Sequence, residues 1–115
     1  MSSNQIARNY ILYPVYEADS KATYYIDTNS IVLNEEGLVT LISKRIGPDV
    51  TSYTLIKIDC INKKYIELGY SEESEQEISL YEGKQPTYWS ELMDGSSKFH
   101  LVQYVCNNLS NLKPQ

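Results

Sequence analysis

The most regular alternation of apolar and polar side chains in this chain runs through residues 50–61. Ile56, Ile58 and Cys60 recur at every second position, with Lys57 among the residues between them. Because successive side chains of a strand point to opposite faces, this spacing predicts a β-strand with one apolar face. Cys60 is expected to lie on that apolar face.

Shorter apolar segments, separated by turn residues, predict further strands. The expected strands are residues 9–16, 22–27, 31–33, 38–46, 63–70 and 78–81. Pro14 cannot donate a hydrogen bond within a sheet, so it confines the first of them to a sheet edge or a strand end. Residues 27–30 carry side chains that bond to nearby backbone, which predicts a corner or a bulge. Residues 34–37 predict a hairpin turn in which Gly37 supplies a positive φ.

The period changes after residues 94–97, which offer N-caps for a helix. Apolar side chains then recur at spacings of three and four, at Val102, Val105, Cys106, Leu109 and Leu112. This spacing predicts one helix that ends at Pro114 and packs its apolar face on the sheet. We therefore expect a single α+β domain over residues 1–115, an antiparallel β-sheet of about six strands packed against a C-terminal α-helix, with residues 1–8 as a flexible N-terminus.

Size and charge narrow the class of protein. The chain has 115 residues, and ten basic side chains against fifteen acidic ones give a net charge of -5. This length suits one compact core. No basic run could neutralise a series of phosphates, which argues against nucleic acid as a partner. The apolar runs fall far short of the roughly 20 residues that a membrane-spanning helix needs, so a membrane-spanning protein is not expected.

The first residues of the chain give no export signal. Residues 1–5 are polar, and no apolar core of the kind found in signal peptides follows them. Two explanations stay open, a cytosolic protein or the mature part of an exported one.

The two cysteines bear on the choice of compartment. Cys60 falls on the apolar face of a predicted strand and Cys106 on the apolar stripe of the predicted helix, so both thiols face the same interface. One interpretation is a disulfide, which would close a loop of about 47 residues, stabilise the fold by ~4 kcal/mol and persist in an oxidising compartment. The other is a pair of buried free thiols in a cytosolic protein.

The order of several short motifs is similar to that of a known family. The marks are Tyr24-Tyr25-Ile26-Asp27, then Ser30-Ile31, Cys60, a lone Trp89 and Cys106. In order and spacing they resemble the surface-adhesin protein E family of Gram-negative bacteria, over most of the chain.

The resemblance implies an exported domain without a catalytic role, located in the periplasm or at the cell surface and stapled by a disulfide between Cys60 and Cys106. The adhesin of that family binds host matrix proteins, plasminogen and haem, and can dimerise. Its central region is strongly basic and aromatic, whereas the corresponding part of this chain keeps only Lys44-Arg45 and later Lys63-Lys64 before it turns acidic. The resemblance therefore informs fold and compartment more than ligand.

The sequence offers few residues for catalysis or for metal binding. His100 is the only histidine, and six residues along a helix set its side chain about 120° away from that of Cys106. Two cysteines and one histidine do not complete a four-ligand zinc site. The glutamates of residues 72–77 lack the aspartate alternation and central glycine of a calcium loop, and they are expected to be solvated. We therefore expect no enzyme, no metal and no cofactor.

Contacts with other proteins are the expected mode of action. Tyr81, Tyr88 and Trp89 form one candidate anchor, because such side chains dominate interface hot spots. The alternative for Trp89 is a ring that seals one end of the core. Lys44 and Arg45 form a second, basic candidate for binding.

The expected partners are host matrix or envelope proteins, or a second copy of the chain joined through a sheet edge. An alternative is a small acidic periplasmic immunity or inhibitor protein that blocks a toxin or an enzyme. The net charge of -5 and the acidic residues 71–77 favour that alternative, because they would steer the protein toward a basic cleft. A third interpretation is an accessory subunit of a secretion or pilus assembly.

Overall fold

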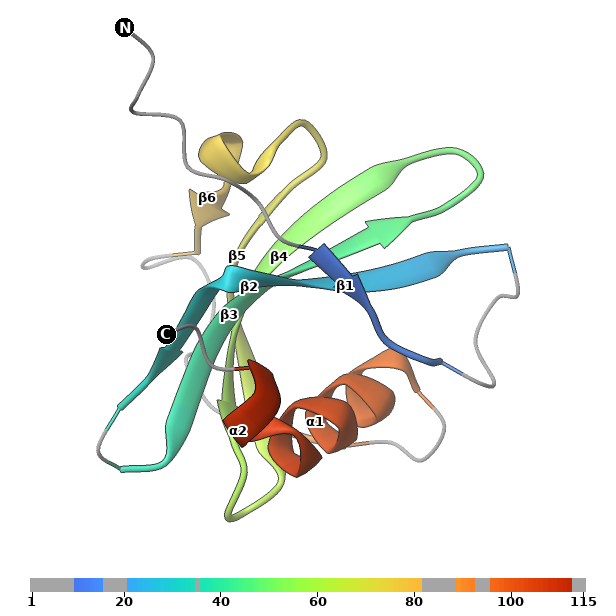
Figure 1. Ribbon diagram of the computed structural model, residues 1–115. Coiled ribbons are helices and arrows are strands. Elements are labelled where there is room, and N and C mark those ends of the chain that lie inside the picture. The colour runs from blue at the N-terminus through green and yellow to red at the C-terminus, as the bar shows by residue number, and fades with distance from the viewer. Residues whose placement is uncertain (1–9, 16–20, 35, 82–88, 93–95, 113–115) are drawn as a thin grey trace, which may run out of the picture.

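The computed structural model describes residues 10–15, 21–34, 36–81, 89–92 and 96–112. Within these residues one twisted antiparallel sheet lies against two short helices (Figure 1). The strands are β1 (Tyr10–Leu12), β2 (Thr23–Leu33), β3 (Leu38–Ile46), β4 (Thr51–Asp59), β5 (Lys64–Ser71), β6 (Ser79–Leu80) and β7 (Ser90–Glu91). The helices are a short 3-10 helix (Glu75–Glu77), α1 (Ser97–Asn107) and α2 (Leu109–Leu112).

The strands follow one another across the sheet in chain order, from β1 to β6. β7 also pairs with β5, at Lys64 and Tyr65, whereas β6 pairs further along the same strand, at Gly69 and Tyr70. The predicted antiparallel sheet and C-terminal helix are confirmed. β7 lies where a loop was expected and brings the sheet to seven strands among the described residues.

β2 is one strand of 11 residues, not two strands joined by a corner. The predicted bulge is present, as a shift in register with β3 between Asp27 and Val32. Local side-chain bonds hold it, because the Asn29 amide donates to Asp27 Oδ1 at 3.0 Å and the Ser30 hydroxyl donates to the Asp27 carbonyl at 2.6 Å. The Ile42 amide of β3 in turn donates to Ser30 Oγ at 2.8 Å, so a side chain replaces a backbone acceptor at the bulge.

The hairpin between β2 and β3 has the predicted turn. Gly37 has a φ of 81°, which a residue with a Cβ adopts only with strain. The Asn34 side chain accepts hydrogen bonds from the amides of Glu36 and Leu38, at 2.8 and 3.0 Å. The predicted strand 38–46 is present with the same bounds.

The core lies between the sheet and α1. Its fully enclosed aliphatic side chains come from three strands and the helix: Ile26, Val39, Leu41, Ile56, Ile58, Leu101, Val102 and Val105. The Cys60–Cys106 disulfide, with an S–S distance of 2.04 Å, packs against this core. The interpretation of the two cysteines as free buried thiols is therefore wrong, and the disulfide is confirmed.

The C-terminal region consists of two helices rather than the single predicted one. Ser96 is the N-cap of α1, and its Oγ accepts from the Phe99 amide at 3.1 Å. At the other end, the Asn108 side chain donates to the Tyr104 carbonyl at 2.8 Å. Because this side chain competes for a carbonyl of the last turn, the helix ends there and α2 begins at Leu109. Pro114 lies outside the described residues.

The acidic residues 71–77 are more ordered than a solvated loop. Glu72 and Glu73 are exposed, as predicted, but Glu75 is half-buried and its carboxylate accepts a hydrogen bond from the Tyr10 hydroxyl of β1. This hydrogen bond therefore links the segment that follows β5 to β1, the first strand in the sheet order. No helix in the described ranges is long and apolar enough to cross a membrane.

Candidate functional site

The face of the sheet that contacts α1, here called the inner face, changes character along its strands. On β3, the inward positions run from Val39 and Leu41 to Ser43 and then Arg45. On β4, opposite them, Ile58 and Ile56 give way to Thr54 and then Ser52. Because Ser43 pairs with Thr54 and Arg45 pairs with Ser52, the change from aliphatic to polar side chains occurs at one level across both strands.

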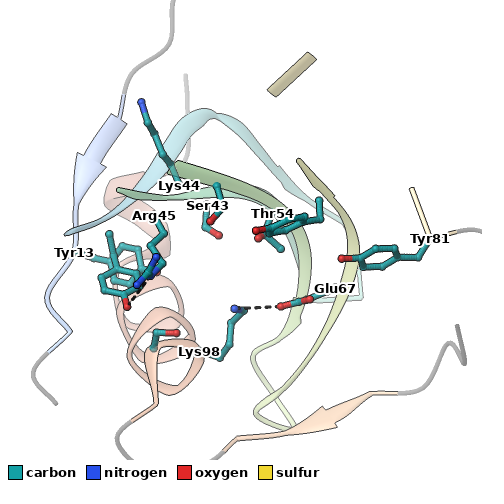
Figure 2. Close-up of a pocket in the computed structure, with 12 residues that line it drawn as sticks. Tyr13, Ser43, Lys44, Arg45, Thr54, Glu67, Tyr81 and Lys98 are labelled. Carbon is teal, nitrogen blue, oxygen red and sulfur yellow. Dashed lines mark hydrogen bonds and ion pairs between the residues drawn. The ribbon is translucent and has the colours of Figure 1, made fainter. Parts of the chain in front are cut away.

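The polar half of the inner face forms a pocket of about 270 Å³ (Figure 2). Strands β2, β3, β4 and β5, the start of α1 and residues beside β1 and β6 contribute to it. The lining residues are Tyr13, Tyr24, Ser43, Lys44, Arg45, Ser52, Thr54, Glu67, Tyr70, Tyr81, Ser97 and Lys98. None of these residues is aliphatic. The pocket therefore has a polar and aromatic lining, whereas the adjoining core is filled by aliphatic side chains.

Charged groups border the pocket on two sides. Lys98, in the first turn of α1, lies with its Nζ 3.2 Å from Glu67 Oε2 on β5. Across the pocket, the Arg45 guanidinium lies 6.0 Å from the ring centre of Tyr24, and its Nε donates to the Tyr24 hydroxyl at 3.4 Å. Figure 2 shows Arg45 apart from the Lys98–Glu67 pair, with the pocket between them.

Three tyrosines of the pocket, Tyr13, Tyr70 and Tyr81, have a raised pKa. Burial raises the pKa of Tyr13, and the neighbouring Tyr24 adds to this shift. Burial also raises the pKa of Tyr81, with a further contribution from the Glu67 carboxylate. The pKa of Tyr70 is raised mainly because its hydroxyl donates to Glu72 Oε2 at 2.7 Å. The protonated form of these three hydroxyls is therefore favoured, and that of Tyr70 already donates to Glu72.

The structure separates the two basic candidates. Arg45 points into the pocket, whereas the Lys44 ammonium lies on the other face of the sheet, 4.5 Å from the ring centre of Tyr10 and 5.5 Å from that of Tyr53. Figure 2 shows the Lys44 side chain directed away from the cavity. Adjacent residues of one strand cannot share a face, so Lys44 and Arg45 do not form one basic patch.

The aromatic candidates are placed in different ways. Tyr81 lines the pocket. Trp89 is half-buried and directly precedes β7. Tyr88 lies outside the described residues. A joint anchor of these three side chains therefore stays a prediction.

Sequence reasoning missed the hydroxyl side chains of the pocket as a site. Ser43, Ser52 and Thr54 occupy inward positions of the strand alternation, where aliphatic side chains would complete a core. Polar side chains at these inward positions were the feature of the sequence from which the site could have been predicted. Among the residues that the structure describes, no group of three His, Cys, Asp or Glu side chains is placed to hold a metal ion.

The chain was also compared with known proteins. No family model, no curated protein and no solved structure matches it. The similarity to the surface-adhesin protein E family therefore rests on the motif order given above and stays a prediction.

Proposed function

We propose that this chain is a non-enzymatic, exported protein of the bacterial envelope, similar to surface-adhesin protein E, that acts by binding other proteins. The observation that carries the proposal is the Cys60–Cys106 disulfide. Disulfides form and persist in oxidising compartments such as the periplasm and the cell surface, and they are rare in the cytosol. The bond ties β4 to α1, so it is part of the fold.

A sheet edge is the surface that we assign to partner binding. Among the described residues, β1 pairs with β2 only from Tyr25 to Asp27, and residues 31–33 of β2 lie beyond it. In this segment Val32 and Leu33 are 62% and 37% exposed. An edge strand with exposed apolar side chains is a template for pairing with another strand. The partner is a host matrix protein, an envelope protein or a second copy of this chain.

The compartment is tested in native cells. Cells are fractionated, and each fraction is treated with an alkylating reagent before and after reduction. We expect the protein in the periplasmic or cell-surface fraction, with both thiols alkylated only after reduction. Recovery in the cytosol with thiols that react at once would contradict the proposal. A double variant, Cys60→Ser with Cys106→Ser, gives the signal expected for a protein without thiols.

The assigned edge is tested by light scattering and by pull-down from the envelope fraction. A Val32→Lys variant places a charge on the edge and should abolish a dimer or the capture of a partner. Leu80→Lys, at a 49% exposed apolar position of β6 at the other end of the strand order, is the control. If Val32→Lys leaves both the mass in solution and the captured proteins unchanged, the edge is not the binding surface.

A second candidate function is that of an acidic inhibitor or immunity protein. The observation in its favour is the exposure of Glu72, Glu73 and Glu77 on one short segment. Such a cluster would steer the protein toward a basic cleft on a toxin or an enzyme. Capture of one stoichiometric basic protein in the same pull-down would favour this candidate, whereas several partners at fixed ratio would favour an assembly subunit.

A further inference from the structure

The pocket on the inner face is rich in one kind of chemical group. Of the 12 residues drawn around it, eight carry a hydroxyl: Tyr13, Tyr24, Ser43, Ser52, Thr54, Tyr70, Tyr81 and Ser97. Each hydroxyl can both donate and accept hydrogen bonds. Polar groups removed from water need hydrogen-bond partners. An occupant that offers both donors and acceptors over most of its surface would match this lining.

We propose that this pocket binds a saccharide unit, a polyhydroxylated ring of monosaccharide size. Pockets for drug-sized ligands span about 300 to 1,000 Å³, and the volume here, about 270 Å³, lies just below that range. A sugar ring carries hydroxyls around its rim that donate and accept alike. This is a small-molecule site and does not depend on the protein contacts proposed above.

The charged groups of the pocket include both signs, which suits a ligand that donates and accepts hydrogen bonds. The Lys98 ammonium already lies 3.2 Å from the Glu67 carboxylate. That carboxylate can also accept hydrogen bonds from sugar hydroxyls. Arg45 adds a fork of donors on the opposite side of the pocket. The ring therefore meets an acceptor at one rim and donors at the other.

The lining also argues against an apolar ligand. Sites for haem or lipid are lined predominantly by hydrophobic side chains, and the residues around this pocket include no aliphatic one. The tyrosines supply apolar ring surface together with a hydroxyl, which suits a ligand with C–H groups on its faces and O–H groups on its edge.

The polar groups are positioned by regular structure rather than by loops. Ser43 and Thr54 face each other on paired strands, and Ser97 and Lys98 begin α1. The disulfide holds α1 to β4. Groups fixed before binding lose little entropy when a ligand arrives, so a shallow polar pocket can still discriminate among sugars.

The proposal is tested by nuclear magnetic resonance with the ¹⁵N-labelled full chain. The probes are glucose, galactose and N-acetylglucosamine at millimolar concentration, the methyl β-glycoside of each, and sodium acetate as an anion without hydroxyls. We expect at least one sugar to shift the amide signals of Ser43, Thr54 and Ser97 in a saturable way. If the methyl glycoside binds as well, the natural ligand is the terminal unit of a glycan. If only the free sugar binds, the natural ligand is a free sugar.

Matched variants locate the site. Thr54→Val keeps the shape of the side chain and removes its hydroxyl, and it should weaken the affinity about tenfold. Thr40→Val makes the same change on the outer face of β3 and should leave the affinity within about twofold. A dispersed spectrum in each variant shows that it is folded. Absence of saturable shifts with every sugar, equal shifts with acetate, or undiminished binding by Thr54→Val would overturn the proposal.

Discussion

Lys98 Nζ lies 3.2 Å from Glu67 Oε2, and this ion pair joins the first turn of α1 to β5 at the edge of the pocket. The two side chains are only 26% and 37% exposed. We expect Lys98→Met to lower the free energy of unfolding by less than ~1 kcal/mol, because ion pairs that retain access to water contribute little. Urea denaturation measures the change.

The Lys64 to Glu91 pair is the matched control for this effect. Its atoms lie 3.4 Å apart, and its side chains are 39% and 78% exposed. Lys64→Met should therefore change the stability less than Lys98→Met does, because water and salt screen an exposed pair more strongly. A larger loss from Lys64→Met would contradict this ranking.

The Cys60–Cys106 disulfide should contribute strongly to the free energy of unfolding, and a reducing agent can remove this contribution. It closes a loop with a sequence separation of 46, for which restriction of the unfolded chain gives ~4 kcal/mol. Urea denaturation with and without reductant should show a loss of that order, and the variant Cys60→Ser with Cys106→Ser should match the reduced protein. If the reduced and oxidised proteins unfold at the same urea concentration, the bond does not stabilise the fold.

The sequence was sufficient to predict the central strands and the placement of the cysteines. Strict alternation around Ile56 and Ile58 fixes which side of β4 faces inward, and Cys60 follows from it. β7 could not be predicted because it has two residues, too few for any period to show. The break at Asn108 depends on one side chain that competes for a helix carbonyl.

The pocket could be predicted only in part. Inward hydroxyls such as Thr54 were visible in the strand alternation, but whether they line a pocket depends on where α1 stops covering the sheet. That boundary is set by packing between residues far apart in the chain, such as Leu101 against the strands, and no local pattern reports it. The Lys98–Glu67 ion pair could not be predicted either, because it joins the start of α1 to β5, and these elements are far apart in the sequence.

The N-cap of α1 should contribute measurably to stability. Ser96 Oγ accepts the Phe99 amide at 3.1 Å, and that amide has no partner within the helix. Ser96→Ala should cost ~1 kcal/mol in the free energy of unfolding. Ser110→Ala, at an exposed position of α2, is the control and should change the stability by less than about 0.5 kcal/mol. Equal effects of both substitutions would show that the cap contributes nothing specific.

Leu101 is the α1 side chain on which we expect the core to depend strongly. It is fully enclosed between the helix and the sheet, so Leu101→Ala removes buried apolar surface and leaves a cavity. The expected loss is ~2–5 kcal/mol. Leu80→Ala, at a position that is 49% exposed, should cost much less. Thermal or urea denaturation followed by circular dichroism compares the two, and a similar loss in both would contradict the assignment of the core.

The turn between β4 and β5 should give stability a specific dependence on acid. The Asn62 side chain donates to Asp59 Oδ2 at 2.8 Å, and this bond, together with the amides of Asn62 and Ile61, lowers the pKa of Asp59 below 3.8. Because the folded pKa is the lower one, the stabilisation is complete above pH 3.8 and is lost as the pH falls through the folded value. In Asn62→Ala the carboxylate loses that donor, so the difference in urea midpoint between wild type and variant should be largest near neutral pH and shrink in acid. Asn111→Ala, an exposed amide in α2, should differ from wild type by the same amount at every pH, and a constant difference for Asn62→Ala as well would refute the coupling to Asp59.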